Sequence, residues 1–416
     1  MKMSRPLVPC FFLTLIARLA QGLDNGVGHA PPMGYNTWNH LGCDGVSAEA
    51  IRRAADGIVE RGFDKLGYRY VNVDDCWAVA RDAQGMLAPD PTMFPQGMRA
   101  VADYVHAKGL KFGLYTDRGV WTCGARPGSA DSFRIDARTF ADWGVDYLKV
   151  DSCNAPDDPK HAIDEYMQLR DWLNSTGRPI FLALCGWAPW YAEVGSVLGN
   201  SWRVARDVNG FREVWNTVSI NSRLSRFAGP GAWNDPDALI SSTGGGRVQL
   251  TETQSRTQFT LWCIMSSPLV LGLPVQDLSD FDVETYGNAE AIAVNQDALG
   301  RQGEIIWQNC PPKSIVDLVR EANASDYPAP PPCQQVWAKP LFGGDWAVAM
   351  VNWGSSPSMV AITAARLHAM GFKDGVHIRD LWRKADLGTY TNGFHGNVRG
   401  AGGSELYRLS PRRLYV

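Results

Sequence analysis

The chain has 416 residues, of which 45% are hydrophobic and 20% are charged, a composition typical of a globular protein. This length accommodates one large domain and one smaller domain. The formal net charge of -3 argues against a nucleic-acid or anionic-membrane partner, because no basic surplus is present to attract one.

The first predicted element is a secretory signal over residues 1–22. Lys2 and Arg5 provide its positive charge, and Leu7–Ala17 is an apolar stretch too short to span a bilayer. We therefore expect a mature chain that begins at Leu23 and is secreted, or delivered to a lysosome or vacuole. We expect no membrane span in the rest of the chain. Disulfides are expected among the cysteines that remain, because such a chain folds in an oxidising compartment.

Residues 23–302 alternate between short apolar runs and longer amphipathic segments. The strand-like runs are Met33–Trp38, Tyr68–Trp77, Leu110–Asp117, Val145–Cys153, Pro179–Trp187, Ser201–Val208, Gly231–Leu239 and Ser267–Val275. Helical patterns lie between them, for example over Ser47–Leu66, Gly97–Lys108, Ala137–Trp143 and His161–Ser175. Eight such units predict a closed (β/α)₈ or TIM barrel of α/β class, with a doubly wound open sheet as the alternative.

Ionisable residues gather at the ends of five of these runs. They are Asp74 and Asp75, Asp117, Lys149 and Asp151, Arg203 and Asp207, and Asp235 and Asp237. A barrel assembles its chemistry at the C-terminal ends of its strands, and two carboxylates that face one pocket are the minimum for glycoside hydrolysis. The alternative for any single aspartate is a cap on the helix that follows it.

Residues 303–416 have a different sequence pattern, in which short strand-like runs are separated by turn residues. The runs are Val316–Val319, Gln335–Ala338, Trp346–Val351, Ser358–Ile362, Val376–Asp380 and Glu405–Leu409. They predict a small antiparallel β-sandwich domain without a catalytic cluster, in which Cys310 and Cys333 could close a loop. We expect no metal and no cofactor, since the chain has no CxxC pair, HExxH helix, P-loop or complete GxGxxG motif.

Several motifs, taken in order, resemble one known family. They are Leu23-Asp24-Asn25-Gly26, Pro32-Met33-Gly34-Tyr35-Asn36-Thr37-Trp38, Asn72-Val73-Asp74-Asp75-Cys76-Trp77, Tyr147-Leu148-Lys149-Val150-Asp151, Trp233-Asn234-Asp235-Pro236-Asp237 and Ala293-Val294-Asn295-Gln296-Asp297. Together they resemble glycoside hydrolase family 27, which contains α-galactosidases and α-N-acetylgalactosaminidases. The resemblance implies a (β/α)₈ barrel followed by an antiparallel β-domain, and a double displacement that retains the configuration of the sugar.

The resemblance also implies roles for individual residues. Asp151 is expected to be the nucleophile and Asp207 the proton donor and acid/base, with their carboxyl groups about 5–5.5 Å apart. We expect Lys149 and Arg203 to keep Asp151 ionised. The expected substrate-binding residues are Trp38, Asp74, Asp75, Tyr115, Lys149, Trp187, Arg203 and Asp237. The family disulfides correspond to Cys43–Cys76 and Cys123–Cys153, and the role of Asp235, structural or in the pocket, is left open.

The chain departs from the family pattern at Gly186, where typical α-galactosidases carry Glu. We expect Gly186 to open space beside C2 of the sugar, and Cys185 to be a free thiol because Gly199 replaces its usual partner. The predicted function is a retaining exo-α-galactosidase acting on galactosides or glycans. The alternatives are an α-N-acetylgalactosaminidase, a β-L-arabinopyranosidase of the same fold, or an inactive sugar-binding protein. Monomer and homodimer both stay open, as does glycosylation at Asn174 and Asn323.

Overall fold

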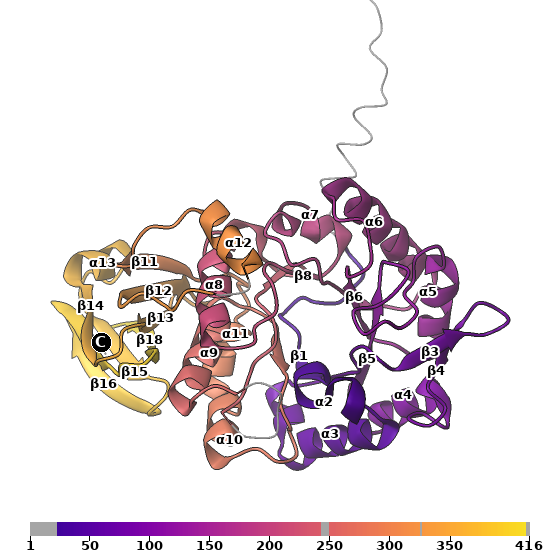
Figure 1. Ribbon diagram of the computed structural model, residues 1–416. Coiled ribbons are helices and arrows are strands. Elements are labelled where there is room, and N and C mark those ends of the chain that lie inside the picture. The colour runs from indigo at the N-terminus through magenta and orange to yellow at the C-terminus, as the bar shows by residue number, and fades with distance from the viewer. Residues whose placement is uncertain (1–22, 243–248, 325–326, 413–416) are drawn as a thin grey trace, which may run out of the picture.

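The computed structural model describes residues 23–242, 249–324 and 327–412, so the predicted signal over residues 1–22 lies outside the described part. Figure 1 shows two bodies side by side, a larger one coloured indigo through magenta to salmon and a smaller β-rich one coloured orange to yellow. Within these ranges no helix is long and apolar enough to cross a membrane.

The larger body contains a sheet of eight parallel strands in the order β10-β1-β2-β5-β6-β7-β8-β9. These strands are β1 (Met33–Asn36), β2 (Tyr70–Asn72), β5 (Lys111–Asp117), β6 (Tyr147–Asp151), β7 (Phe181–Leu184), β8 (Ser201–Arg203), β9 (Trp233–Asp235) and β10 (Leu269–Leu271). Leu239, just after β9, joins the two edges of the sheet, because its amide donates to Val270 O at 2.8 Å and its carbonyl accepts from Gly272 N at 3.0 Å. The predicted barrel and its eight strands are confirmed, with shorter strands than the apolar runs suggested.

Helices surround this barrel and connect its strands. They are α2 (Trp38–Gly45), α3 (Ala48–Glu60), α4 (Gly97–Ala107), α5 (Phe133–Asp142), α6 (Pro159–Ser175), α7 (Tyr191–Leu198), α8 (Phe211–Asn221), α9 (Glu252–Ile264), α10 (Asp280–Tyr286) and α11 (Ala289–Asn295), with 3₁₀ turns η1 (Phe63–Leu66) and η2 (Ser225–Phe227). A small hairpin, β3 (Ala78–Arg81) and β4 (Leu87–Pro89), follows β2. The sequence explains why helix α3 forms. Ser47 Oγ accepts from Ala50 N and caps the helix, and Ile51, Ala55 and Ile58 are buried at helical spacing.

The smaller body is an antiparallel sandwich of a six-stranded sheet, ordered β11-β12-β13-β18-β15-β16, and a two-stranded sheet, β14 and β17. Its elements are β11 (Glu304–Gln308), α12 (Ile315–Asn323), β12 (Gln334–Pro340), β13 (Trp346–Asn352), β14 (Ser358–Thr363), α13 (Ala364–Ala369), β15 (Val376–Asp380), β16 (Ala385–Tyr390), β17 (Gly393–Val398) and β18 (Gly403–Pro411). Along β13, Ala349 and Val351 pack toward the barrel core, whereas Val348 and Met350 pack between the two sheets. The larger sheet is therefore apolar on both faces.

The strand predicted over Val316–Val319 is wrong, because these residues belong to helix α12. Ser314 and Asp317 form a capping box, each side chain bonding the backbone amide of the other. Leu318 and Ala322 are buried four residues apart, while Val316 is 63% exposed. The apolar pair has the period of a helix, and a run of four residues was too short to show it.

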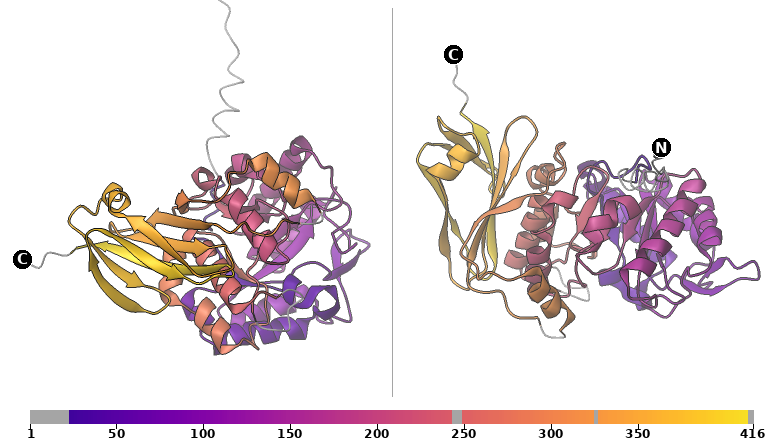
Figure 2. Two further views of the ribbon diagram at one scale, coloured as in Figure 1. Left: turned by 60° about the vertical axis from the view of Figure 1, so that its left-hand side comes forward. Right: turned by 90° about the horizontal axis from the view of Figure 1, so that it is seen from above.

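Helix α9 lies between the barrel and the larger sheet of the sandwich, as the two views of Figure 2 show. Thr257 Oγ1 of this helix donates to Ser404 Oγ at 2.9 Å, and Trp382 Nε1 donates to Thr260 Oγ1 at 3.2 Å. Lys339 of β12 is completely buried and donates to Val294 O at 2.6 Å. The two bodies thus share one buried boundary with both apolar and polar contacts.

Candidate active site

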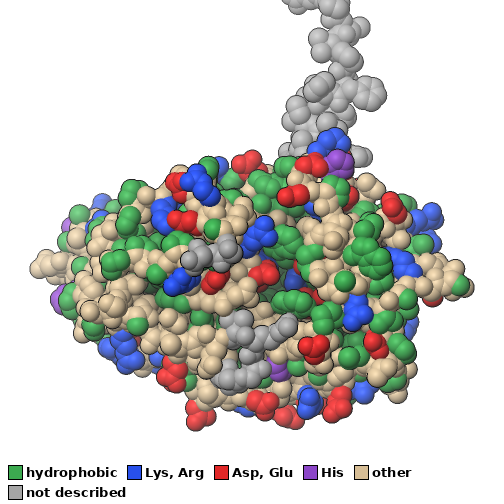
Figure 3. All heavy atoms as spheres, viewed as in Figure 1, with side chains coloured by type: hydrophobic (Ala, Val, Ile, Leu, Met, Phe, Trp, Pro, Cys, Tyr) green, Lys and Arg blue, Asp and Glu red, His purple; other side chains and the backbone are tan. Residues whose placement is uncertain are grey.

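A pocket opens at the C-terminal ends of the barrel strands. Its volume is about 560 Å³, within the range typical of small-molecule sites. Every residue predicted to act in catalysis or substrate binding lines it, namely Trp38, Asp74, Asp75, Tyr115, Lys149, Asp151, Trp187, Arg203, Asp207 and Asp237. Figure 3 shows acidic and basic side chains around a hollow near the middle of this face. The barrel therefore brings together side chains that are up to 199 positions apart in the sequence, from Trp38 to Asp237.

Asp151 ends strand β6 and is buried at the bottom of this pocket. Its carboxylate accepts from Tyr115 Oη at 3.1 Å and from Ser152 N at 3.0 Å. Burial raises the pKa of Asp151 to about 7, the positive charge of Lys149 opposes that rise, and the negative charge of Asp117 adds to it. The expectation that nearby cations keep this pKa low is wrong here, because desolvation outweighs them.

Asp207 lies four residues beyond Arg203, in the loop after β8, and its side chain is 53% exposed. Its pKa is lowered, because the charges of Arg203 and Lys149 outweigh the opposing effect of burial. Arg203 Nη2 donates to Asp207 Oδ1 at 3.0 Å, and Arg203 Nη1 lies 3.1 Å from Asp237 Oδ1. One buried guanidinium therefore holds two carboxylates at the wall of the pocket.

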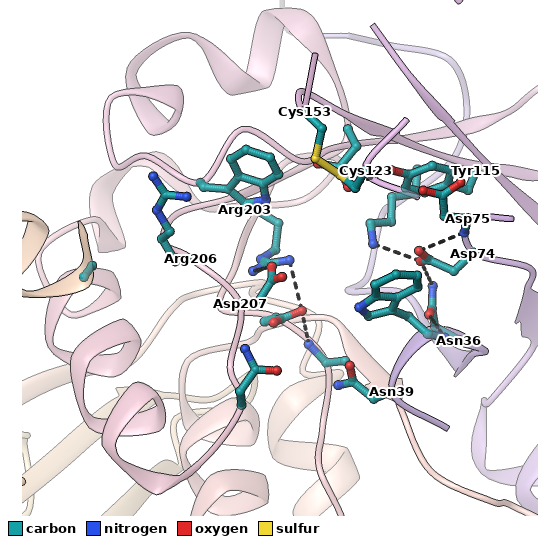
Figure 4. Close-up of a pocket in the computed structure, with 18 of the residues that line it drawn as sticks. Asn36, Asn39, Asp74, Asp75, Tyr115, Cys123, Cys153, Arg203, Arg206 and Asp207 are labelled. Atoms are coloured by element: carbon teal, nitrogen blue, oxygen red, sulfur yellow. Dashed lines mark hydrogen bonds and ion pairs between the residues drawn. A yellow bond between two sulfur atoms is a disulfide. The ribbon is translucent and has the colours of Figure 1, made fainter. Parts of the chain in front are cut away.

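Asp74 and Asp75 follow strand β2 and form the opposite corner of the pocket (Figure 4). Asp74 Oδ2 accepts from Asn36 Nδ2 at 2.6 Å and from Lys149 Nζ at 2.9 Å. Asp75 Oδ1 accepts from Cys76 N, and burial raises the pKa of Asp75. Carboxylates fixed in this way are good acceptors for the hydroxyl groups of a sugar.

Two disulfides support this rim. The structure has the expected pairs Cys43–Cys76 and Cys123–Cys153, and a third pair, Cys310–Cys333, in the β-domain. Among the cysteines within the described ranges, Cys185 forms no disulfide and is buried, as the sequence suggested.

One group of atoms near Asp151 has the spacing of metal ligands. The side-chain atoms of Asp117, Cys123, Asp151 and Cys153 lie within 4.8 Å of one another. The two sulfurs are bonded to each other and are not thiolates. Asp117 accepts from Gly119 N and Cys153 N. Because metal sites use thiolates, imidazoles and carboxylates, this group is a poor donor set.

The loop after β7 differs from what the sequence suggested. A Cβ at Gly186 would lie 2.0 Å from Cε2 and Cζ of Tyr191, so the ring of Tyr191 fills the space that we expected to be open. Gly186 itself does not line the pocket, whereas its neighbour Trp187 does. Trp187 (φ 56°) and Asp237 (φ 88°) both have left-handed backbone angles. Strained residues of this kind concentrate at functional sites.

The sequence reasoning missed several residues of the pocket. They are Asn36, Asn39, Arg206, Asn209, Ala238, Ala322, Asn323, Ala324 and Tyr327, which line the pocket and had no role in it assigned from the sequence. Asn36 belongs to a quoted motif and Arg206 precedes Asp207, so adjacency was an available signal for both. The residues from α12 and beyond gave no signal of a place in the pocket, because that region was predicted as a β-sandwich without a catalytic cluster. Asp235 lies under the pocket, where it accepts from Asp237 N at 2.8 Å and lines a cavity of about 40 Å³.

The chain matches family models over both of its bodies. Residues 30–297 match the model of a family described as alpha galactosidase A, and residues 332–409 match the alpha galactosidase C-terminal beta sandwich domain. This chain belongs to glycoside hydrolase family 27. As a member of this α-galactosidase family, it is a glycoside hydrolase.

Individual relatives agree with this assignment. Alpha-galactosidase 3 of Arabidopsis thaliana is 40% identical over 402 residues, which cover 94% of this chain and 84% of the relative. The crystal structure of α-galactosidase I from Mortierella vinacea has a TM-score of 0.82 at 31% identity and covers 94% of this chain and 99% of that chain. A β-L-arabinopyranosidase of Geobacillus stearothermophilus has a TM-score of 0.76 at 24% identity, over 92% of this chain and 97% of that one. At that identity the last comparison shows the fold alone.

Proposed function

We propose that this chain releases terminal α-D-galactose from oligosaccharides or glycoconjugates by double displacement with retention. The observation that carries the proposal is the joint placement of Asp151, Asp207 and the Asp74–Asp75 pair in one pocket. The α-galactosidase relatives support the choice of sugar. An inactive sugar-binding protein is disfavoured, because both carboxylates needed for hydrolysis are present.

In the first step the Asp151 carboxylate attacks C1 of galactose from the face opposite the leaving group. The bond from C1 to the glycosidic oxygen breaks as Asp207 donates its proton to that oxygen. The leaving alcohol departs, and galactose stays bound to Asp151 as an ester. In the second step Asp207, now ionised, takes a proton from water, and the water oxygen attacks C1. This restores the Asp151 carboxylate and returns the proton to Asp207.

The pKa values of Asp151 and Asp207 lie in the opposite order to the one that their proposed roles require. The pKa of Asp151 is raised to about 7, whereas that of Asp207 is lowered. The form with one proton therefore carries it mainly on Asp151, but the first step requires the proton on Asp207.

Sugar recognition is assigned to the fixed carboxylates and to Arg203. Asp74 and Asp75 would accept hydrogen bonds from galactose hydroxyls, and Trp38 would line the wall beside the ring. Arg203 is the proposed donor near O2, since Gly186 has no side chain and does not line the pocket. Tyr191 occupies the space beside Gly186, so Gly186 provides no open room for a 2-acetamido group.

We further propose that residues 1–22 are a secretory signal, 23–302 the catalytic barrel and 303–416 the β-domain. The three disulfides support folding in an oxidising compartment. Amino-terminal sequencing of the protein purified from a secreting host should give Leu23 as the first residue.

The test of function is a comparison of kcat/KM for four nitrophenyl glycosides. They are the α-galactoside, the α-N-acetylgalactosaminide, the β-L-arabinopyranoside and the α-glucoside. We expect the α-galactoside to be hydrolysed best. A higher value for the acetamido sugar or the arabinopyranoside would assign the chain to one of these other activities, and no turnover of any substrate would favour a sugar-binding protein.

A further inference from the structure

The connection between β11 and β12 is longer than the pairing of these two strands requires. The two strands are antiparallel neighbours, with Gln308 paired to Gln335, and such strands need only a short turn. Instead the chain leaves the sheet, forms α12 and returns to Cys333, which is bonded to Cys310 with their Cα atoms 4.8 Å apart. We call residues 310–324 the α12 segment. In Figure 1 it lies beside α8, over the barrel and away from the sandwich strands.

Several contacts fix the α12 segment to α8 and its neighbourhood. Asn216 Nδ2 of α8 donates to Leu318 O at 3.0 Å, in a buried position. Arg223 Nη2 donates to Lys313 O at 3.1 Å, and Lys313 Nζ pairs with Glu321 at 2.5 Å. The segment is thus bonded to the α8 region at Lys313, just before the helix, and at Leu318, in its middle.

The C-terminal end of α12 reaches the active-site pocket. Ala322, Asn323 and Ala324 line it. Asn323 Oδ1 accepts from Arg206 Nε at 3.1 Å, and the Arg206 guanidinium lies 5.7 Å from the centre of the Trp187 ring. Asn323 is exposed toward the opening, and its amide nitrogen donates no hydrogen bond within the described ranges.

Tyr327, just past the helix, lines the same wall. Burial and the charge of Glu213 raise the pKa of Tyr327, and the charge of Asp207 adds to this shift.

The position of Asp207 tells which part of the substrate this wall faces. Asp207 protonates the glycosidic oxygen in the proposed reaction, so it marks the border between galactose and the leaving group. Asp74 and Asp75 lie at the galactose end, whereas Arg206 adjoins Asp207 on the other side, as Figure 4 shows. Side chains beyond Arg206 therefore face the leaving group.

We propose that Asn323 and Arg206 form a binding site for a sugar ring in the leaving group. The Asn323 amide and the terminal nitrogens of Arg206 donate hydrogen bonds to hydroxyls of that sugar, and Tyr327 adds an aromatic surface beside it. Asn323 and Arg206 then set how strongly the enzyme prefers a sugar leaving group over a smaller one. This inference rests on the proposed function and assigns specificity residues on its leaving-group side.

The experiment compares two substrates that differ only in the leaving group. Melibiose (galactose α-1,6-linked to glucose) presents a sugar, whereas α-galactosyl fluoride presents a single atom that cannot contact the wall. Asn323→Ala should lower the ratio of kcat/KM for melibiose to that for α-galactosyl fluoride by roughly three- to tenfold, the effect of one lost hydrogen bond. The matched control is Arg320→Ala on the same helix, since Arg320 is 74% exposed and does not line the pocket; it should keep the parent ratio.

A second control separates the side chain from a glycan. Asn323-Ala324-Ser325 is a glycosylation sequon, and Ser325→Ala removes it while keeping Asn323. This variant should keep the parent ratio. An unchanged ratio in Asn323→Ala, or the same altered ratio in Ser325→Ala, would overturn the inference. A parent enzyme that hydrolyses neither substrate would refute the proposed function itself, and the inference with it.

Discussion

At the scale of single residues, the balance between burial and charge pairing differs between Asp151 and Asp207. Asp151 is almost inaccessible to solvent, and desolvation raises its pKa to about 7 although Lys149 is close by. Asp207, which is half exposed and bonded to Arg203, has a lowered pKa instead. Two residues of the same type thus receive opposite shifts from their surroundings.

This difference predicts the pH dependence of activity. In the proposed mechanism only ionised Asp151 attacks. The leaving group of 4-nitrophenyl α-galactoside needs no proton, so kcat/KM for this substrate should rise with pH up to about 7 and then level. Asp117 pairs with Asp151 in the β5–β6 register, and its negative charge raises the pKa of Asp151. Asp117→Asn removes that charge and should move the rising limb to lower pH. A limb that stays in place or moves to higher pH would contradict this account.

Asp207 gives a second prediction at this scale. Asp207→Asn should lower kcat/KM for a poor leaving group, such as the glucose of melibiose, by roughly 10²–10⁴-fold, because the leaving oxygen then departs without a proton. The loss on 4-nitrophenyl α-galactoside should be much smaller. The ratio kcat/KM includes only the steps up to the first bond cleavage. It is therefore unaffected by the loss of Asp207 as the base of the second step. Equal losses on the two substrates would remove Asp207 from the acid role.

At the scale of elements, the loop between β7 and α7 is shaped by a close approach. Gly186 has room for no Cβ, because the buried ring of Tyr191 occupies that position and stacks on Trp190 with ring centres 3.8 Å apart. The glycine is therefore explained by packing, whereas the sequence alone suggested an open subsite.

Gly186→Ala should be destabilising for this reason. We expect a loss of about 1–3 kcal/mol in the free energy of unfolding, the usual effect of overpacking, measured by denaturant titration. Gly229→Ala is the matched control, since nothing lies within 4 Å of the position that its Cβ would take, and it should be near neutral. Adding Tyr191→Leu should recover part of the loss, whereas a neutral Gly186→Ala would show that the loop adjusts freely.

The sequence predicted the elements that have strong local patterns. Eight apolar runs located the barrel strands, and polar residues at their ends located the pocket, since parallel strands bring their C-terminal ends to one side. Helix α12 was predicted as a strand, because Val316–Val319 is a short apolar run whose helical period appears only with Ala322. The contribution of Asn323 and Tyr327 to the pocket depends on long-range packing, which local patterns do not contain.

At the scale of the whole molecule, the barrel and the sandwich are joined by a buried lysine. Lys339 of β12 donates to Ser266 Oγ at 2.5 Å and to Val294 O at 2.6 Å on the barrel side. Burial lowers the pKa of Lys339 to about 8, below the usual value for lysine in an unfolded chain. A lysine whose pKa is lower in the folded than in the unfolded chain destabilises the folded state most at pH values below its folded pKa, where it is protonated in both states.

Lys339 therefore predicts a pH-dependent contribution to stability. Between pH about 8 and 10.4 the unfolded chain binds a proton that the folded chain does not, so the free energy of unfolding gains up to about 1.4 kcal/mol per pH unit from this residue. Lys339→Met lacks this gain. The melting temperature of the parent relative to the variant should rise across that range. A constant difference would mean that Lys339 stays charged in the folded protein.

The central claim is that Asp151 forms a covalent bond with galactose, and one measurement tests it directly. 5-Fluoro-α-galactosyl fluoride should glycosylate the enzyme and hydrolyse slowly, because the ring fluorine destabilises the positive charge of both transition states. Mass spectrometry of the intact protein and its peptides should show one sugar per chain, attached to Asp151, and no label on Asp151→Asn. A label on another residue, or turnover of the probe with inversion and without a covalent species, would contradict the account.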